Sequence, residues 1–314
     1  MKDLDLHPNI SWHPLQYHKS PPVLSSLYDI TRLRLKAKRL VEENKIKVVH
    51  CRGYITSLVG LDLKIGFGLK FIFDMRGFWA DEKLESGNWS SPIFKPVYRY
   101  FKKKEKQFII NSDRVISLTN AGKTFILDTF SVDAGKVRVV PTCVDLSHFQ
   151  RSDSSERNLI RKHFGIEENE SVFIYSGSLG GNYPVKLLME YYEELSKDLK
   201  KSRLLVLSRQ NDLLNGYPEV ISKSVDRNKM PQYLSAGNTG IIFYKSGFSN
   251  IGRCPTKYAE YVACGLNVEY PEPYGDLGAY DPTNITKFFD LAVGVNVYDE
   301  VYKDVLNPKF LKLK

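Results

Sequence analysis

Short apolar runs alternate with segments of helical period along most of the chain. The runs Ile46–His50, Lys70–Asp74 and Ser171–Ser176 have the length and composition of buried strands. The segments Asp29–Glu43 and Val185–Leu199 instead space their apolar residues for one face of a helix. Such an alternation is typical of parallel α/β architecture. The pattern predicts further strands at Arg114–Leu118, Val137–Val140, Leu204–Ser208 and Gly240–Tyr244, and further helices after Pro92, after Thr119, at Met230–Ala236, at Pro255–Cys264 and from Thr286 onward.

The alternation is interrupted once, near the middle of the chain. Arg151–Arg157 is polar and lacks apolar periodicity, so we predict a linker there. This divides the chain into a first domain over residues 1–150, a second domain over residues 151–290 and a C-terminal helix over residues 291–314 that packs back on the first domain. Ligands of open α/β sheets bind beyond the carboxyl ends of the strands, so we expect a binding cleft between the two sheets.

The composition is that of an ordinary globular protein. Of the 314 residues, 42% are hydrophobic and 26% are charged, which excludes a disordered or a collagen-like chain. The longest apolar runs, around Ile55–Leu63 and Ile241–Tyr244, are too short to cross a bilayer. Met1–Ser20 lacks the apolar stretch of a secretory signal, so we expect a cytoplasmic protein. The cysteines form no CxxC pair, which disfavours a disulfide scaffold or a zinc knuckle; they are Cys51, Cys143, Cys254 and Cys264.

The net charge of +9 indicates an anionic partner, and its densest cluster lies in one predicted helix. The cluster comprises Arg99, Lys102, Lys103, Lys104 and Lys106, interleaved with aromatic residues. It fits either a solvated helix face or a basic and aromatic face that lies on anionic phospholipid. Nucleic-acid binding is disfavoured, because no nucleic-acid recognition motif accompanies the charge.

The segment Cys254–Gly265 is the most informative one. Pro255 suits the first position of a helix and Gly265 suits the position just past its end. The unpaired amides of the first helical turn attract phosphate, and Lys257 adds a full positive charge there. Glu260 lies three residues later on the same face, where a carboxylate could accept hydrogen bonds from a ribose diol. The alternative is a surface pair of Lys257 and Glu260 without a ligand.

Two further segments carry candidate ligand contacts. In Tyr175–Gly181, a glycine-rich turn follows a strand and could approach a diphosphate closely, although many such turns are only structural. It matches neither the dinucleotide fingerprint nor the P-loop, so no dehydrogenase or NTPase motif is present.

In the first half, polar residues follow two predicted strands: Arg52 and Gly53 after one, and the loop Met75–Trp89 after the other. Together with Asp74 at a strand end, this loop favours a cleft. Asp74 with Asp81 or Glu82 could also form a carboxylate pair for acid–base chemistry, and an Asp74–Arg76 pair could merely structure a turn.

The chain resembles glycosyltransferase family 4, the retaining nucleotide-sugar enzymes with a GT-B fold of two Rossmann-like domains facing a cleft. PTKYAEYVACG at residues 255–265 and PTCVDLSHF at 141–149 are the specific matches; CRGY, FIFDMRGFWADE, DRVISLT and YSGSLG support them. The resemblance implies that the first domain binds a glycan or lipid-linked acceptor and that the second binds a UDP- or GDP-sugar. It also implies a metal-independent hexosyltransferase, without cofactor, in which cations neutralise the departing diphosphate.

The resemblance also implies roles for single residues. It implies that Glu260 binds the ribose, that Lys257 neutralises the diphosphate, and that Arg76 or Asp74 contacts the acceptor or the sugar. We take these four as the catalytic candidates. The donor-binding candidates are Gly177, Ser178, Leu179, Arg209, Asn250, Thr256, Lys257 and Glu260, and the acceptor-side candidates are Arg52, Gly53 and Trp79.

This sequence departs from the family in several places. The family often carries a second acid eight positions before Glu260, where this chain has Gly252, so that Ser249, Asn250 or backbone amides would have to contact the sugar. Ser178 stands where many relatives have Arg, and Asn267 where Pro is usual. The first helix is also reached without the strand and glycine-rich turn that open the family's first domain, so we expect a shortened first sheet. Two alternatives remain open. The missing acid and the missing first strand would fit a non-catalytic nucleotide-sugar or glycan-binding protein, and a nucleotide-sugar 2-epimerase would share the two-domain fold.

Overall fold

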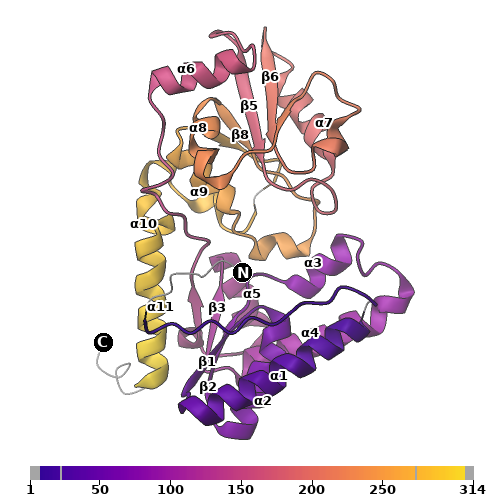
Figure 1. Cartoon of the computed structure of the whole chain (residues 1–314), viewed down its shortest axis with the longest axis vertical. Coiled ribbons are helices and arrows are strands. Elements are labelled where there is room, and N and C mark those ends of the chain that lie inside the picture. The colour runs from indigo at the N-terminus through magenta and orange to yellow at the C-terminus, as the bar shows by residue number, and fades with distance from the viewer. Residues whose placement is uncertain (1–7, 22, 273, 308–314) are drawn as a thin grey trace.

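The computed structural model describes residues 8–21, 23–272 and 274–307. Two α/β domains lie one above the other, and the C-terminal helices run along one side from the upper domain to the lower one (Figure 1). Each domain contains a parallel sheet. The prediction of a two-sheet α/β fold is therefore confirmed.

The first sheet has the strand order β1-β2-β3-β4, and all four strands are parallel. The strands are β1 (Val48–Arg52), β2 (Lys70–Asp74), β3 (Arg114–Ser117) and β4 (Val137–Val139). The helices of this domain are α1 (Leu24–Asn44), α2 (Tyr54–Phe67), α3 (Trp79–Glu85), α4 (Lys95–Asn111) and α5 (Asn120–Phe130). Arg52 and Asp74 lie opposite each other in the register, so the carboxyl ends of β1 and β2 reach the same edge.

The second sheet has the order β7-β6-β5-β8-β9 and is also parallel. Its strands are β5 (Ser171–Ser176), β6 (Ser202–Leu207), β7 (Ile221–Lys223), β8 (Thr239–Ile241) and β9 (Asn267–Glu269). Its helices are α6 (Ser154–His163), α7 (Val185–Ser196), α8 (Met230–Ser235) and α9 (Thr256–Ala263). The central strand β5 is buried along almost its whole length because both sheet faces are covered.

The C-terminal helices α10 (Thr286–Phe289) and α11 (Leu291–Leu306) return the chain to the first domain. Val301 and Val305 of α11 pack against Ile72, Ile116 and Val140 on one face of the first sheet. Burial of these apolar side chains stabilises the contact between α11 and the sheet of the first domain, whose strands lie much earlier in the sequence.

Three local predictions are wrong, and one helix was not predicted. The first helix begins at Leu24, not at Asp29, and the Asp29 carboxylate inside it accepts a hydrogen bond from the His18 backbone N at 2.8 Å. The predicted linker Arg151–Arg157 contains the start of α6, where the Asp153 side chain caps the helix by accepting from the Glu156 N. Helix α2 was not predicted. It lies in an apolar run without helical periodicity, because residues on most sides of the helix are buried. Helix α3 lies inside the predicted loop Met75–Trp89.

None of the described helices combines the length and the apolarity that crossing a bilayer requires. The four cysteines are free thiols, and three of them are buried.

Candidate functional site

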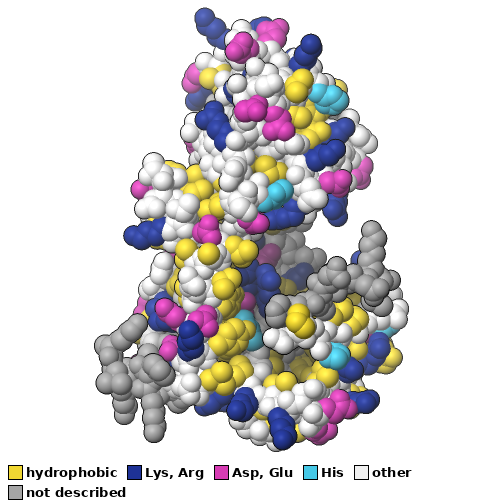
Figure 2. All heavy atoms as spheres, turned by 60° about the vertical axis from the view of Figure 1, so that its left-hand side comes forward, with side chains coloured by type: hydrophobic (Ala, Val, Ile, Leu, Met, Phe, Trp, Pro, Cys, Tyr) yellow, Lys and Arg dark blue, Asp and Glu magenta, His cyan; other side chains and the backbone are white. Residues whose placement is uncertain are grey.

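A cavity of about 570 Å³ lies in the second domain, next to the carboxyl ends of β5 and β6 and the start of α9. Six of the predicted donor-binding residues line it; they are Gly177, Ser178, Arg209, Thr256, Lys257 and Glu260. We call it the nucleotide pocket, because the sequence analysis predicts that these residues bind a nucleotide. Figure 2 shows the surface hollowed between the upper and the lower domain, with Lys and Arg side chains in the hollow.

Helix α9 forms one wall of this pocket, and the residues that flank it determine where it begins and ends. Pro255 holds the position before the first helical residue with φ −68°, and Gly265 follows the helix with φ +81°, a left-handed conformation that favours glycine. The helix therefore begins at the pocket, and its first-turn amides carry a partial positive charge there.

Lys257 lies in the first turn of α9 and its ammonium group faces the turn after β5. The Nζ atom is 4.0 Å from the ring centroid of Tyr175 and 5.5 Å from that of Tyr183. A Cβ atom on Gly177 would lie 3.3 Å from Nζ, so a larger residue at position 177 would crowd the ammonium group. Among the described residues no carboxylate lies within 4 Å of Nζ, and burial lowers the pKa of Lys257 to about 7, with an opposing contribution from Glu260.

Glu260 lies one turn further along α9 and is 8% exposed. Burial raises the pKa of its carboxyl group, while the nearby charges of Arg227 and Lys257 oppose this shift. The Arg227 guanidinium lies 3.4 Å from Glu260 Oε1 and 5.3 Å from the ring centroid of Phe149. The sequence analysis missed Arg227, because it lies in a polar stretch between β7 and α8 that matches no motif.

Two donor-binding candidates lie outside the cavity lining. The Leu179 side chain is buried in the core of the second domain, and its backbone N donates to Gln210 Oε1 at 3.3 Å. The Asn250 side chain is also buried, and it donates to Glu272 Oε1 at 2.8 Å. Its oxygen accepts from Arg253 Nε at 2.8 Å, so both ends of the amide have protein partners.

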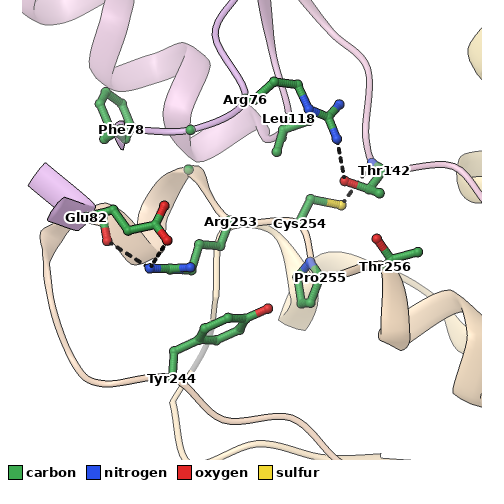
Figure 3. A pocket seen from close by; sticks show the side chains of 13 residues that line it. Arg76, Phe78, Glu82, Leu118, Thr142, Tyr244, Arg253, Cys254, Pro255 and Thr256 are labelled. Atoms are coloured by element: carbon green, nitrogen blue, oxygen red, sulfur yellow. Dashed lines mark hydrogen bonds and ion pairs between the residues drawn. The ribbon is translucent and has the colours of Figure 1, made fainter. Parts of the chain in front are cut away.

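A second cavity of about 240 Å³ lies between the domains, and Tyr244 and Thr256 line both it and the nucleotide pocket. We call it the interdomain cavity. Arg76 lies on the first-domain side, where its Nη2 donates to Thr142 Oγ1 at 3.3 Å (Figure 3). On the opposite side, Arg253 lies 4.5 Å from the ring centroid of Tyr244 and 3.4 Å from Glu82 Oε1.

The two domains approach each other closely at two glycines beside this cavity. A Cβ on Gly252 would lie 2.8 Å from Phe78 Cδ2 and 3.1 Å from the Gly77 Cα, and a Cβ on Gly77 would lie 3.2 Å from the Gly252 carbonyl oxygen. A side chain at position 252 would therefore displace the Phe78 ring or the backbone at Gly77, so this close approach of the two domains depends on the glycine.

The other first-domain candidates line neither cavity. Asp74 is buried and accepts from the Tyr298 hydroxyl of α11 at 3.1 Å. Arg52 is exposed, and Gly53 precedes α2 with φ +82°. Trp79 packs against Tyr54 with ring centroids 5.5 Å apart, within the aromatic part of the first core. These residues lie at or near the strand ends, as predicted; the side chains of Asp74 and Trp79 have partners within the protein, whereas that of Arg52 is exposed.

The proposed carboxylate pair also has other partners. Asp81 accepts from Tyr98 and from Lys102, and Glu82 contacts the second domain through Arg253 and Asn182. Within the described ranges, His, Cys, Asp and Glu side chains form no group of three or more that could hold a metal ion.

The basic cluster of α4 separates into two kinds of residue. Lys102 donates to Asp81 at 2.7 Å and to the buried Glu105 at 2.6 Å. Arg99, Lys103 and Lys106 are exposed, and Lys104 lies 5.8 Å from the Tyr100 ring centroid. Within this cluster, the charge of Lys102 is paired inside the protein, whereas the charges of the other four residues are available to an external partner.

Comparisons with known proteins agree with this architecture. Residues 5–148 match the family described as Glycosyltransferase Family 4. No curated protein matches the chain.

Among solved structures, the Anabaena protein HepE in complex with UDP and glucose is similar with a TM-score of 0.63 and 12% identity, over 89% of this chain and 83% of that one. Sucrose-phosphate synthase from Thermosynechococcus elongatus has a TM-score of 0.61 and 15% identity, over 96% and 77% of the two chains. A glycosyltransferase from Rickettsia africae has a TM-score of 0.58 and 12% identity, over 94% and 85%. The resemblance to glycosyltransferase family 4 is thus confirmed by the match over residues 5–148, and the chain as a whole has the GT-B fold.

Proposed function

We propose that this protein is a retaining glycosyltransferase that moves a sugar from a nucleoside-diphosphate sugar to a glycan or lipid-linked acceptor. The observation that carries the proposal is the pairing of Lys257 and Glu260 on one short helix, both facing the nucleotide pocket. One supplies a cation without a carboxylate partner and the other a buried carboxylate. The separation of one helical turn suits the diphosphate and the ribose of the same ligand.

In this proposal each group acts on a different part of the donor. Glu260 accepts hydrogen bonds from the ribose hydroxyls, with Arg227 holding the carboxylate in place. Lys257, Arg209 and the first amides of α9 hold the diphosphate, which gains negative charge as the bond to the sugar breaks. Because these groups are fixed before the reaction, they stabilise the departing diphosphate without reorganisation, and no metal ion is required.

The reaction itself exchanges one bond at the sugar for another. The bond from the anomeric carbon to the diphosphate oxygen breaks, and a bond to the acceptor oxygen forms on the same face of the ring. The acceptor hydroxyl passes its proton to the departing phosphate oxygen, so no enzyme nucleophile is needed. The structural neighbour HepE was solved with UDP and with UDP-glucose, which supports a UDP-sugar as the first donor to test.

We further propose that the acceptor is reached at an anionic membrane surface on the cytoplasmic side. The exposed cations Arg99, Lys103 and Lys106 would lie against lipid headgroups, each contributing about 1 kcal/mol. Tyr100 on the same helix is 47% exposed and could enter the interfacial region.

Calorimetric titration with UDP and GDP tests the nucleotide site, and Glu260→Gln tests its assignment. We expect binding of one nucleotide, and an affinity about 30-fold lower in the variant because the charge-assisted bonds to the ribose are lost. Arg39→Gln, at an exposed position of α1, is the surface control and should bind normally. No binding of either nucleotide at millimolar concentration would contradict the proposal, and binding without sugar transfer to any envelope glycan acceptor would favour a non-catalytic binding protein.

A further inference from the structure

We propose that the interdomain cavity binds the sugar of the donor and that this sugar carries a carboxylate, as a hexuronic acid does. This inference rests on the proposed function, because it assumes that the nucleotide pocket holds the diphosphate. It goes further in naming the chemical class of the transferred sugar. Arg76 is the residue that we assign to the carboxylate.

The position of the cavity fits the sugar. Tyr244 and Thr256 line both the nucleotide pocket and the interdomain cavity, so the two spaces adjoin. A diphosphate held by Lys257 at the start of α9 would direct its sugar past Thr256 toward the first domain. The volume of about 240 Å³ is suited to a single monosaccharide.

The charges of the cavity do not cancel. Among the residues that line the cavity, only Glu82 has a carboxylate, and it lies 3.4 Å from Arg253. Arg253 also donates hydrogen bonds to Asn250 and Ser249. Arg76 has no carboxylate within 4 Å among the described residues, and Thr142 is the one side chain to which it donates there. The cavity therefore has an excess positive charge at Arg76.

A carboxylate is the partner that this guanidinium lacks. Arg76 is half-buried, so only part of its charge is removed from bulk water. A bound sugar would displace more of that water, and a sugar with hydroxyl groups alone would then leave the guanidinium without an anion. A carboxylate can instead accept two parallel hydrogen bonds from it. Glu82 also lines the cavity, and its carboxylate could accept a hydrogen bond from a ring hydroxyl.

The backbone holds Arg76 in place at a conformational cost. Arg76 has φ +55°, a left-handed conformation that is rare for a residue with a side chain, and Gly77 follows with φ +96°. The close approach of Gly77 to Gly252 fixes this turn between the domains. Backbone strain of this kind persists where the surrounding structure enforces it, and it is common where a side chain must point at a ligand.

The diphosphate is a less fitting partner for Arg76. Lys257 and Arg209 already face the nucleotide pocket, and Arg76 does not line that pocket.

Calorimetry with matched donor pairs tests this inference on the full chain. The ligands are UDP, UDP-glucose with UDP-glucuronate, and UDP-galactose with UDP-galacturonate; if GDP is preferred, the pair is GDP-mannose with GDP-mannuronate. We expect one uronate to bind about 10- to 100-fold more tightly than its neutral partner. Arg76→Gln should bring that ratio close to one while the affinity for the free nucleotide changes less than about twofold. The control Arg39→Gln, at an exposed position of α1, should leave both unchanged.

Three results would overturn the inference, and they differ in what else they overturn. Equal or weaker binding of every uronate in a protein that binds UDP or GDP rejects the acidic sugar and leaves the proposed function intact. A loss of nucleotide affinity in Arg76→Gln equal to the loss of uronate affinity places Arg76 at the diphosphate. Absence of binding of both nucleotides rejects the proposed function together with the inference. Retained nucleotide binding in Arg76→Gln also shows that this variant is folded.

Discussion

Two partly buried lysines, one in each domain, have opposite surroundings. Lys102 in the first domain donates to two carboxylates, Asp81 and Glu105. Burial alone would lower its pKa, but these two anions together raise the pKa above the usual value of a lysine. Lys257 in the second domain is surrounded by tyrosine rings, has no carboxylate within 4 Å among the described residues, and has its pKa lowered to about 7.

The comparison shows why residue type alone does not identify a site. Lys102 stabilises its own domain, because its charge is compensated within the protein. Burial destabilises the charged form of Lys257, and an anionic ligand beside it would reverse that effect. A partly buried cation that has no carboxylate partner within the protein is therefore a candidate for binding an anionic ligand.

The largest expected effect is that of Lys257→Ala on transfer. Removing the cation from the diphosphate should lower kcat/KM for the donor by about 1,000-fold, or about 4 kcal/mol, because the departing charge loses a fixed partner. Steady-state measurement of released nucleoside diphosphate checks this. Lys257→Arg is the control that keeps a charge on the helix and should recover part of the activity. Full activity in Lys257→Ala would reassign the diphosphate to other groups.

The second prediction separates Lys102 from its neighbour on the same helix. Lys102→Met should lower the free energy of unfolding by about 3 kcal/mol, because Glu105 would remain buried without its cation. Lys103→Met, at an exposed position, should change it by less than about 0.5 kcal/mol. Urea denaturation measures both, and vesicles with anionic lipid should bind Lys103→Met less well than the unchanged protein. Equal stabilities of the two variants would mean that the contacts of Lys102 contribute nothing.

Much of the fold could be predicted because buried strands have a local signature. The bounds of β2 and β5 coincide with the predicted runs Lys70–Asp74 and Ser171–Ser176. Helix α2 could not be predicted by periodicity, since residues on most of its sides are buried and no polar face marks it. Helix α9 was predicted at Pro255–Cys264 and lies at Thr256–Ala263, within one residue at each end, because the backbone preferences of Pro255 and Gly265 act locally.

The candidate site was predictable only in part, because its contacts join distant segments. Lys257 and Glu260 were found from their spacing on one helix, whereas Arg227 reaches Glu260 from a loop that has no sequence signal. Asn250 and Trp79 have suitable chemistry and lie near the cleft, but the folded chain uses both in its own packing. No local pattern distinguishes a polar side chain that meets a ligand from one that meets the protein.

The smallest effect that we predict concerns pH and depends on Lys257 alone. Its pKa of about 7 means that the free protein loses the ammonium charge as the pH rises through neutrality. An anionic ligand stabilises the charged form and raises the pKa in the complex, so affinity should be highest below pH 7 and should fall by up to about tenfold per unit above it. A nucleotide sugar is the appropriate ligand because its diphosphate has no group that titrates near neutrality. Calorimetry from pH 6 to pH 9 should show this decline, and Lys257→Arg should remove it since arginine stays protonated throughout. A profile that stays flat above pH 7 in the unchanged protein would show that the ammonium of Lys257 is as well compensated as that of Lys102, and the contrast between the two lysines would then disappear.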